Sequence, residues 1–216
     1  MKKKDDVISN ILGAFRDNAY PGDAFLQGSF EGCEPYDEIS YFKGVTDWTI
    51  LKADIMDAHY DALSFFSEAG FRFFLPAYLI ADLKEELKTA DPIFHLTGGF
   101  STLSAKIPKQ HRTYIRKSGG DVLLNPRRYG AISFADYSRY RLSVFAKEEA
   151  RAIVAYLQYV RDRDADHIYG DQIDAALNSF WLARTQNAAS REDLEKQLQE
   201  EEEFIAAMDT STEDPQ

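Results

Sequence analysis

Ser67-Glu68-Ala69-Gly70-Phe71-Arg72-Phe73-Phe74-Leu75-Pro76-Ala77-Tyr78-Leu79-Ile80-Ala81 is the stretch that decides the fold. From Phe71 to Ala81 the only charged residue is Arg72, so a helix here would be apolar on every side. Such helices lie inside a protein. The apolar run is well short of the ~20 residues needed to cross a bilayer, and charges follow it at once. We therefore expect a buried central helix and no contact with a membrane.

The ends and the middle of this helix carry their own signals. Ser67 is placed to cap the first amides, and the charged residues after Ala81 predict that the helix continues to about Leu87. Pro76 lies inside the helix and removes one backbone hydrogen bond. The sequence therefore predicts a kink near Phe73 to Ala77.

Composition suits a single globular domain. The chain has 216 residues, of which 44% are hydrophobic, and its formal net charge is -11. The N-terminal region has no continuous apolar segment of the kind found in signal peptides, which predicts a cytoplasmic protein. Cys33 is the only cysteine, so neither an intrachain disulfide nor a thiolate-based zinc cluster can form.

The charge is unevenly distributed along the chain. Residues 106–141 hold 9 Lys and Arg against 2 Asp and Glu, a net charge of +7. Residues 191–216 hold 2 Lys and Arg against 10 Asp and Glu, a net charge of -8. Because these charges are opposite, we expect the acidic tail to fold back over the basic segment.

Apolar spacing predicts several further helices. The first is capped by Asp5 or Asp6, and a short one opens at Pro35 and is followed by short helical pieces. Two strongly periodic helices follow, the second capped by Asp171, and Ser190 begins a last helix with a thin apolar stripe. The apolar positions of these helices are Ile8, Ile11, Leu12, Phe15; Trp48, Leu51, Ile55, Met56, Leu63, Phe65, Phe66; Ala150, Ile153, Val154, Leu157, Val160; Ile173, Ala176, Leu177, Phe180, Trp181; and Leu194, Leu198, Ile205, Met208.

Three short apolar runs are strand candidates: Ile93–Thr97, Val122–Leu124 and Ala131–Phe134. Loops with one short helix or hairpin are expected between them. The predicted fold class is therefore mainly α, an α+β fold with a minor β element. It comprises one helical domain over residues 5–188, built around the Pro-kinked helix, and an acidic helical arm with a disordered end over residues 189–216.

The motif Phe71-Arg72-Phe73-Phe74-Leu75-Pro76-Ala77-Tyr78 resembles the core of a family of uncharacterised bacterial proteins, carried as a domain of unknown function. The resemblance covers most of residues 8–183, and the segment 98–140 and the tail after Ser190 depart from it. It implies a fold and no activity. The other stretches that carry it are Cys33-Glu34-Pro35-Tyr36-Asp37-Glu38, Trp48, Phe94-His95-Leu96-Thr97, Arg141-Leu142-Ser143-Val144-Phe145 and Trp181.

Catalytic and metal-binding patterns are weak. A metal site could combine Cys33, Glu34, Asp37 and Glu38 with a histidine, but the spacing matches no ligand signature, and the acids also suit the first turn of a helix. The four histidines are scattered, and His95 has the apolar context of a structural histidine. No Gly-x-Ser-x-Gly turn occurs, and the run Arg116–Gly120 lacks the order of a nucleotide-binding loop. We expect no metal and no cofactor.

Arg72 gives the most specific prediction of any single residue, because a guanidinium in an apolar helix needs a carboxylate. The favoured interpretation is an ion pair with Asp37, Glu38 or Asp47, and the alternative is an anion site in a cleft. The basic segment is the other binding candidate, since its cations alternate with aromatic residues as in phosphate and base-stacking surfaces. The commoner explanation is that such residues form intramolecular ion pairs with the acidic body of the protein. Its candidate binding residues are Arg112, Arg116, Lys117, Arg127 and Arg128.

Three classes of function remain open. The first is a non-catalytic interaction or regulatory protein of the immunity or antitoxin type, which would bind an unidentified and basic protein partner. The second is a nucleic-acid or other polyanion binder that uses residues 106–141, and the third is an enzyme with an unrecognised site. We favour the first, because the chain is small and acidic and carries no catalytic signature.

Overall fold

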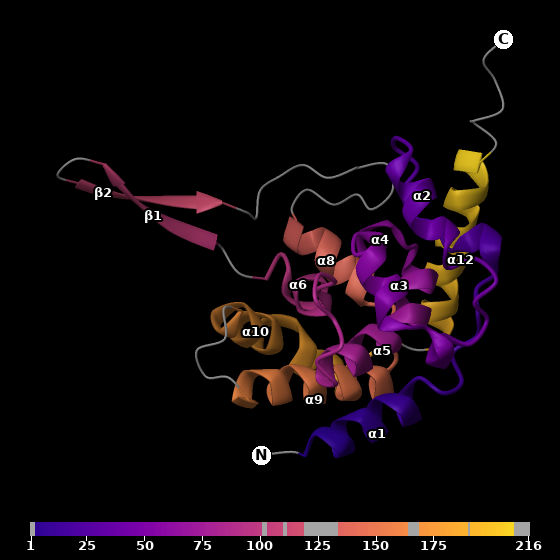
Figure 1. Ribbon diagram of the computed structural model, residues 1–216, viewed down its shortest axis with the longest axis horizontal. Coiled ribbons are helices and arrows are strands. Elements are labelled where there is room, and N and C mark those ends of the chain that lie inside the picture. The colour runs from indigo at the N-terminus through magenta and orange to yellow at the C-terminus, as the bar shows by residue number, and fades with distance from the viewer. Residues whose placement is uncertain are drawn as a thin grey trace, which may run out of the picture.

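The computed structural model describes residues 3–100, 103–109, 112–118, 134–163, 169–189 and 191–209 (Figure 1). The fold is mainly helical, as the sequence predicts, and forms a single helical domain. The elements are α1 (Lys4–Ala14), η1 (Asp23–Phe25), α2 (Glu34–Ser40), η2 (Trp48–Ile50), α3 (Ala53–Ala58), α4 (Ala62–Phe65), α5 (Glu68–Leu83), α6 (Pro92–Thr97), β1 (Leu103–Lys109), β2 (Arg112–Ser118), α8 (Phe134–Leu142), α9 (Lys147–Arg163), α10 (Gly170–Ala176), η3 (Leu177–Trp181), α11 (Leu182–Arg184) and α12 (Arg191–Asp209).

α5 is the buried central helix that the apolar run predicts. The Ser67 side chain accepts a hydrogen bond from the Gly70 amide at 2.9 Å, which confirms the predicted cap. Pro76 lies inside the helix, and the predicted kink stays a prediction. The predicted end at Leu87 is wrong: α5 stops at Leu83, because Glu85 adopts a left-handed conformation with φ 62° and turns the chain away.

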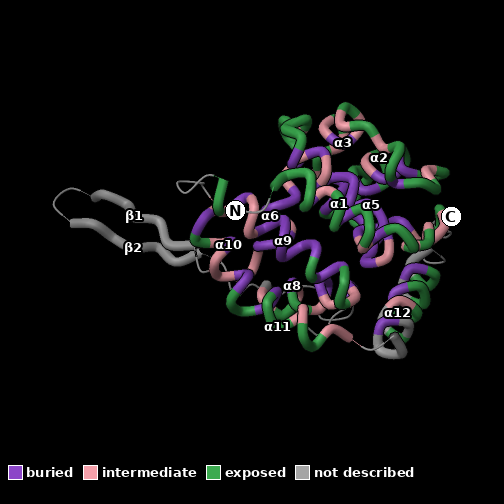
Figure 2. Tube along the Cα trace, turned by 90° about the horizontal axis from the view of Figure 1, so that it is seen from below, coloured by how far each residue is buried: buried purple, intermediate pink, exposed green. Residues whose placement is uncertain are grey.

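The core forms around α5, which contacts α1, η2, α3, α6 and α12. Figure 2 shows buried residues running through α5 and α9, with exposed residues on the outer helices. Phe66 and Phe74 stack at 5.0 Å between ring centroids, and Phe42 meets both rings edge-on. Twelve residues of α5, among them Phe74, are buried, so the helix has no extended polar face.

The periodic helices are confirmed, with differences at their ends. Val7 and Ile11 of α1 and its C-cap residue Phe15 are buried, while Leu12 is 42% exposed, so the inward face is rotated from the predicted one. Asp5 and Asp6 lie inside the first turn and do not cap it. Asp171 likewise lies in the first turn of α10, whose N-cap position is Tyr169. Acids in a first turn still favour a helix through its dipole.

The predicted strand Ile93–Thr97 is wrong. This run is helix α6, because the Asp91 side chain accepts from the Phe94 amide at 3.0 Å and Pro92 occupies the first turn. Helix α6 is held to the second half of the chain by the indole of Trp181, which donates to the Leu96 carbonyl at 2.8 Å.

The minor β element is a hairpin. β1 and β2 pair antiparallel, with Lys109 opposite Arg112 and Leu103 opposite Ser118. The hairpin expected in the basic segment is therefore present. The strand candidate Val122–Leu124 lies outside the described residues, as do 131–133 of the candidate Ala131–Phe134. Phe134 itself is helical and begins α8, so a strand reaching that residue is wrong.

α9 and the helices after it close the core. The predicted face of α9, from Ala150 to Val160, is buried, and η3 is a π-helical turn that places Phe180 and Trp181 inward. In the described part of the chain, no helix combines the length and apolar character needed to cross a membrane. The predicted domain limits, 5–188 and 189–216, stay predictions.

Candidate functional site

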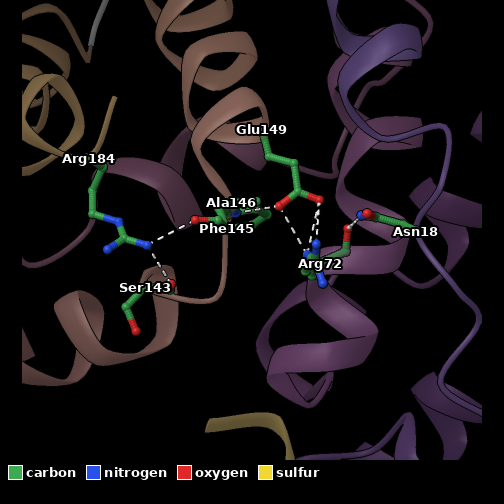
Figure 3. Close-up of polar contacts among 7 residues, drawn as sticks. All are labelled: Asn18, Arg72, Ser143, Phe145, Ala146, Glu149 and Arg184. Atoms are coloured by element: carbon green, nitrogen blue, oxygen red, sulfur yellow. Dashed lines mark hydrogen bonds and ion pairs between the residues drawn. The ribbon is translucent and has the colours of Figure 1, made fainter. Parts of the chain in front are cut away.

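Arg72 is held by an acid that lies far away in the sequence. Its Nε lies 3.0 Å from both carboxylate oxygens of Glu149, and its Nη2 lies 3.0 Å from Oε1 (Figure 3). Arg72 keeps 22% of its side chain exposed, whereas Glu149 keeps 2%. The expectation of an ion pair is therefore correct, but the predicted partners Asp37, Glu38 and Asp47 are wrong.

Glu149 also organises the start of α9. Its Oε2 accepts from the Ala146 amide at 2.6 Å, which is the reciprocal half of a capping box. Arg184 binds the same connection from the other side, since its Nη2 donates to the carbonyls of Ser143 at 2.7 Å and Phe145 at 2.9 Å (Figure 3). The guanidinium of Arg72 is thus part of a structural network between α5 and α9.

The candidate residues of the basic segment are only partly described. Arg112, Arg116 and Lys117 lie on β2, opposite Lys109, Ala105 and Ser104 respectively. Arg127 and Arg128 lie outside the described residues. The structure therefore brings two cations, Lys109 and Arg112, to one end of the hairpin and leaves the wider polyanion surface a prediction.

The last arginine of the basic segment has a structural role. Arg141 is 8% exposed and donates to the carbonyls of Leu63 at 2.6 Å and Phe66 at 3.2 Å, at the end of α4. Its guanidinium also lies 4.6 Å from the centre of the Phe71 ring. These contacts bind α8 to the entry of α5, so intramolecular contacts account for this member of the segment.

A different group of side chains gathers on α2 and the turn between α3 and α4. We call it the α2–turn surface, and its members are Glu34, Glu38, Tyr41, His59, Tyr60 and Asp61. His59 connects the two elements: its Nδ1 lies 3.5 Å from Glu38 Oε1, and its ring stacks on Tyr41 at 3.9 Å between centroids. Tyr41 is 60% exposed and Tyr60 is 48% exposed. Two large aromatic side chains therefore face solvent beside three acids.

The electric field of this surface is negative. The charge of Asp61, together with a hydrogen bond to it, raises the pKa of Tyr60, and the charges of Glu34 and Glu38 act in the same direction. Burial raises the pKa of Glu38, and the charge of Asp61 adds to this rise. His59 and a hydrogen bond to the Asp61 backbone lower the pKa of Glu38 and oppose the rise. Neighbouring carboxylates therefore act on both Tyr60 and Glu38.

Three buried polar atoms near this surface lack hydrogen bonds among the described residues. They are Glu38 Oε2, His59 Nδ1 and the Tyr78 hydroxyl. The 3.5 Å contact of His59 with Glu38 is thus an ion-pair distance without a formed hydrogen bond. Burial raises the pKa of Tyr78, and the charge of Glu38 adds to this effect. A desolvated carboxylate with an incomplete hydrogen-bond shell is costly, and such groups occur at functional sites.

The structure meets only part of what a metal site in the Cys33 to Glu38 stretch would require. A histidine does reach the stretch, namely His59 at Glu38. Cys33 is exposed, and among the residues that the structure describes no three His, Cys, Asp or Glu side chains are arranged to hold a metal ion. The arrangement offers charge and aromatic surface in place of a coordination site.

His95 lies apart from the α2–turn surface. Burial, with a smaller effect of the Arg141 charge, lowers the pKa of His95 to about 3. Its ring lies 6.3 Å from that of Phe71 and 5.4 Å from that of Phe94. The imidazole is therefore neutral at physiological pH, as the apolar context of a structural histidine predicts.

Sequence reasoning missed the α2–turn surface as a unit. It singled out Glu34 and Glu38 as metal ligands or first-turn acids, and it treated the histidines as scattered. The available signal was the acidic and aromatic composition shared by two segments, Glu34–Tyr41 and His59–Asp61. Their proximity depends on the packing of α2 against α4, which no local pattern encodes.

Comparison with known proteins identifies a family and no activity. Residues 3–185 match the model of a family of unknown function, DUF6714. No curated protein and no solved structure matches the chain. The matched region covers α1 to α11 and includes the α2–turn surface, whereas α12 lies beyond it.

Proposed function

We propose that this chain, which belongs to the DUF6714 family, is a non-catalytic interaction protein that binds a basic protein partner through the α2–turn surface. One observation carries the proposal: two exposed tyrosines stand among three carboxylates, and none of the six members of the surface is Lys or Arg. Tyrosine is enriched at the centres of protein interfaces, where its ring supplies apolar area and its hydroxyl a hydrogen bond.

Charge complementarity selects the kind of partner. Glu34, Glu38 and Asp61 would repel an acidic surface and attract Lys and Arg side chains, which raises association rates and fixes orientation. The net charge of -11 extends this attraction beyond the surface itself. An immunity or antitoxin protein, which masks a basic toxin, is the type of interaction protein that this charge suits.

Glu38, a partly buried member of the α2–turn surface, also supports the proposal. Its carboxylate is desolvated, and the imidazole of His59 lies 3.5 Å away. A guanidinium or ammonium group that lands between Tyr41 and Tyr60 would approach this carboxylate and could stack on the tyrosine rings as well. The surface thus combines an aromatic platform with a negative centre.

Site-specific photo-crosslinking in the native host tests the proposal. A photoreactive phenylalanine analogue at Tyr41 should capture a protein whose own sequence is basic. The same analogue at Leu182, which is 42% exposed on α11, serves as the matched control. Figure 2 shows α11 and α2 on different sides of the body, so the control should not capture that protein.

Charge reversal then tests the recognition. Glu34→Lys should weaken binding of the captured partner at least about tenfold and reduce its dependence on salt. Glu86→Lys, an equal change at an exposed site just after α5, should have a small effect. Capture of an acidic protein or of nucleic acid, equal capture from Leu182, or no capture at all would overturn the proposal.

The polyanion alternative remains as a second proposal. It is favoured by the register of the hairpin, which sets Lys109 opposite Arg112 in a chain that is otherwise acidic. Binding to single-stranded DNA or heparin at about 50 mM salt, lost when Arg127→Glu is combined with Arg128→Glu, would support it. Absence of binding at that salt concentration would end it.

The cellular setting is also part of the proposal. We propose a bacterial protein, supported by the family resemblance of the central motif, and we propose that it acts in the cytoplasm. Fractionation of the native host, with detection of the chain in the cytoplasmic fraction, tests this directly.

A further inference from the structure

The N-terminus of α5 is closed by a side chain of α12. The carboxylate of Glu201 accepts hydrogen bonds from the amides of Glu68 and Ala69, the latter at 2.9 Å. Ser67 Oγ takes the next amide, that of Gly70, at 2.9 Å. The first three amides of the central helix are therefore satisfied, two of them by a residue more than 130 positions away.

The chemistry of this contact makes it depend on charge. Free amides and the helix dipole at an N-terminus favour an anion, and a carboxylate supplies two oxygens to two N–H groups. Glu201 is 4% exposed, so its charge is stabilised by these bonds in place of water. A side chain of the same shape without the charge would leave one of the two amides without an acceptor.

Glu201 lies within the apolar stripe of α12. Leu194, Leu198, Glu201 and Ile205 follow one another at helical spacing, and the structure buries the first and last and half-buries Leu198. Lys196 and Glu200, which form an i,i+4 pair at 3.8 Å, are exposed, as are Glu202 and Glu203. Among the α12 side chains that the structure describes, Leu194, Leu198, Ile205 and the carboxylate of Glu201 make the attachment.

We propose that α12 is a releasable strap that Glu201 fastens to the N-terminus of α5. The match to the family ends at residue 185, so the strap is joined to a body that the family model already covers. Release would free the amides of Glu68 and Ala69 and would turn α12 into an acidic helix with an uncovered apolar stripe. A weakly buried segment that opens before the core unfolds has a low local stability.

Amide hydrogen exchange on the full-length chain tests the strap. Glu201→Gln should speed exchange at Glu68 and Ala69 by about tenfold or more, since one of the two amides loses its acceptor and the other keeps only a neutral one. Cleavage by a protease in the connection 186–190 should also accelerate. Glu202→Gln removes the same charge from the adjacent exposed position and should behave as the unmodified protein does.

A second variant separates release of the strap from fraying of α5. Ser67→Ala removes the cap on Gly70 and should speed exchange there while the connection 186–190 keeps its resistance to the protease. Unchanged exchange at Glu68 and Ala69 in Glu201→Gln would overturn the proposal. Equal acceleration across α9 would overturn it too, because α12 would then be an integral part of the core.

Discussion

The ion pair between Arg72 and Glu149 allows a quantitative test of what joins α5 to α9. Removing one partner of a fully buried pair costs about 3 to 5 kcal/mol, because the other charge stays desolvated. Arg72 retains 22% exposure, so water offsets part of that cost. We expect Glu149→Gln to lower the free energy of unfolding by about 2 to 3 kcal/mol, since Gln keeps an acceptor for the Ala146 amide but loses the charge.

A double-mutant cycle isolates the pair from the cap. Arg72→Met, Glu149→Gln and the double variant are unfolded in urea and followed by circular dichroism, with the slope used to check two-state behaviour. The double variant should be more stable than the sum of the single effects predicts, by about 1 to 3 kcal/mol. Glu148→Gln, at the neighbouring exposed position, should stay within about 0.5 kcal/mol. Additive single effects would refute the pairing as a source of stability.

Two further predictions concern the core and a loop. Phe74→Ala should cost about 2 to 5 kcal/mol, because Phe74 is fully buried among Phe42, Phe66 and Phe73, and an unchanged melting midpoint would contradict the central position of α5. Asp57→Ala should speed amide exchange at Lys88, Thr89 and Ala90, since all three amides donate to its carboxylate at 2.9 to 3.1 Å. If these amides exchange as slowly in the variant as in the unmodified protein, the loop is held without Asp57.

Helices whose apolar residues recur at regular spacing could be predicted from the sequence because that signal is local. α5 and α9 each place a long apolar pattern on adjacent turns, and burial follows from the pattern itself. The run Ile93–Thr97 is too short for its period to separate strand from helix. Asp91 and Pro92, an N-cap residue followed by a first-turn proline, were the better signal there, and they indicate a helix.

The contacts of Arg72 and of the strap could not be predicted, because each joins residues far apart in the chain. Arg72 called for a carboxylate, but several acids were available and only the packing of α5 against α9 selects Glu149. Glu201 looked like one of four consecutive glutamates. Its position seven residues after Leu194 and four before Ile205 was a usable clue, since an acid in an apolar stripe needs a buried donor.

The pair of Glu38 and His59 should make stability depend on pH in a direction that follows from burial. Burial raises the pKa of Glu38 in the folded protein, so the folded state binds that proton more readily than the unfolded chain does. The stability that Glu38 contributes through this proton is therefore fully present below the pKa of Glu38 in the unfolded chain. It is lost as the pH rises through the pKa of Glu38 in the folded protein. His59 and Asp61 are the titratable groups that act on this carboxyl, and its own charge acts on Tyr60 and Tyr78.

Glu38→Gln imitates the protonated acid and removes this loss. Its melting midpoint should equal that of the unmodified protein at about pH 4 and exceed it increasingly as the pH rises toward 7. Glu34→Gln changes an exposed acid on the same helix. Its melting midpoint should differ from that of the unmodified protein by an amount that does not grow as the pH rises. If the advantage of Glu38→Gln instead shrinks as the pH rises, the ion pair with His59 outweighs desolvation. The carboxylate would then be a stabilised anion, and the negative centre proposed for partner binding would already be neutralised within the chain.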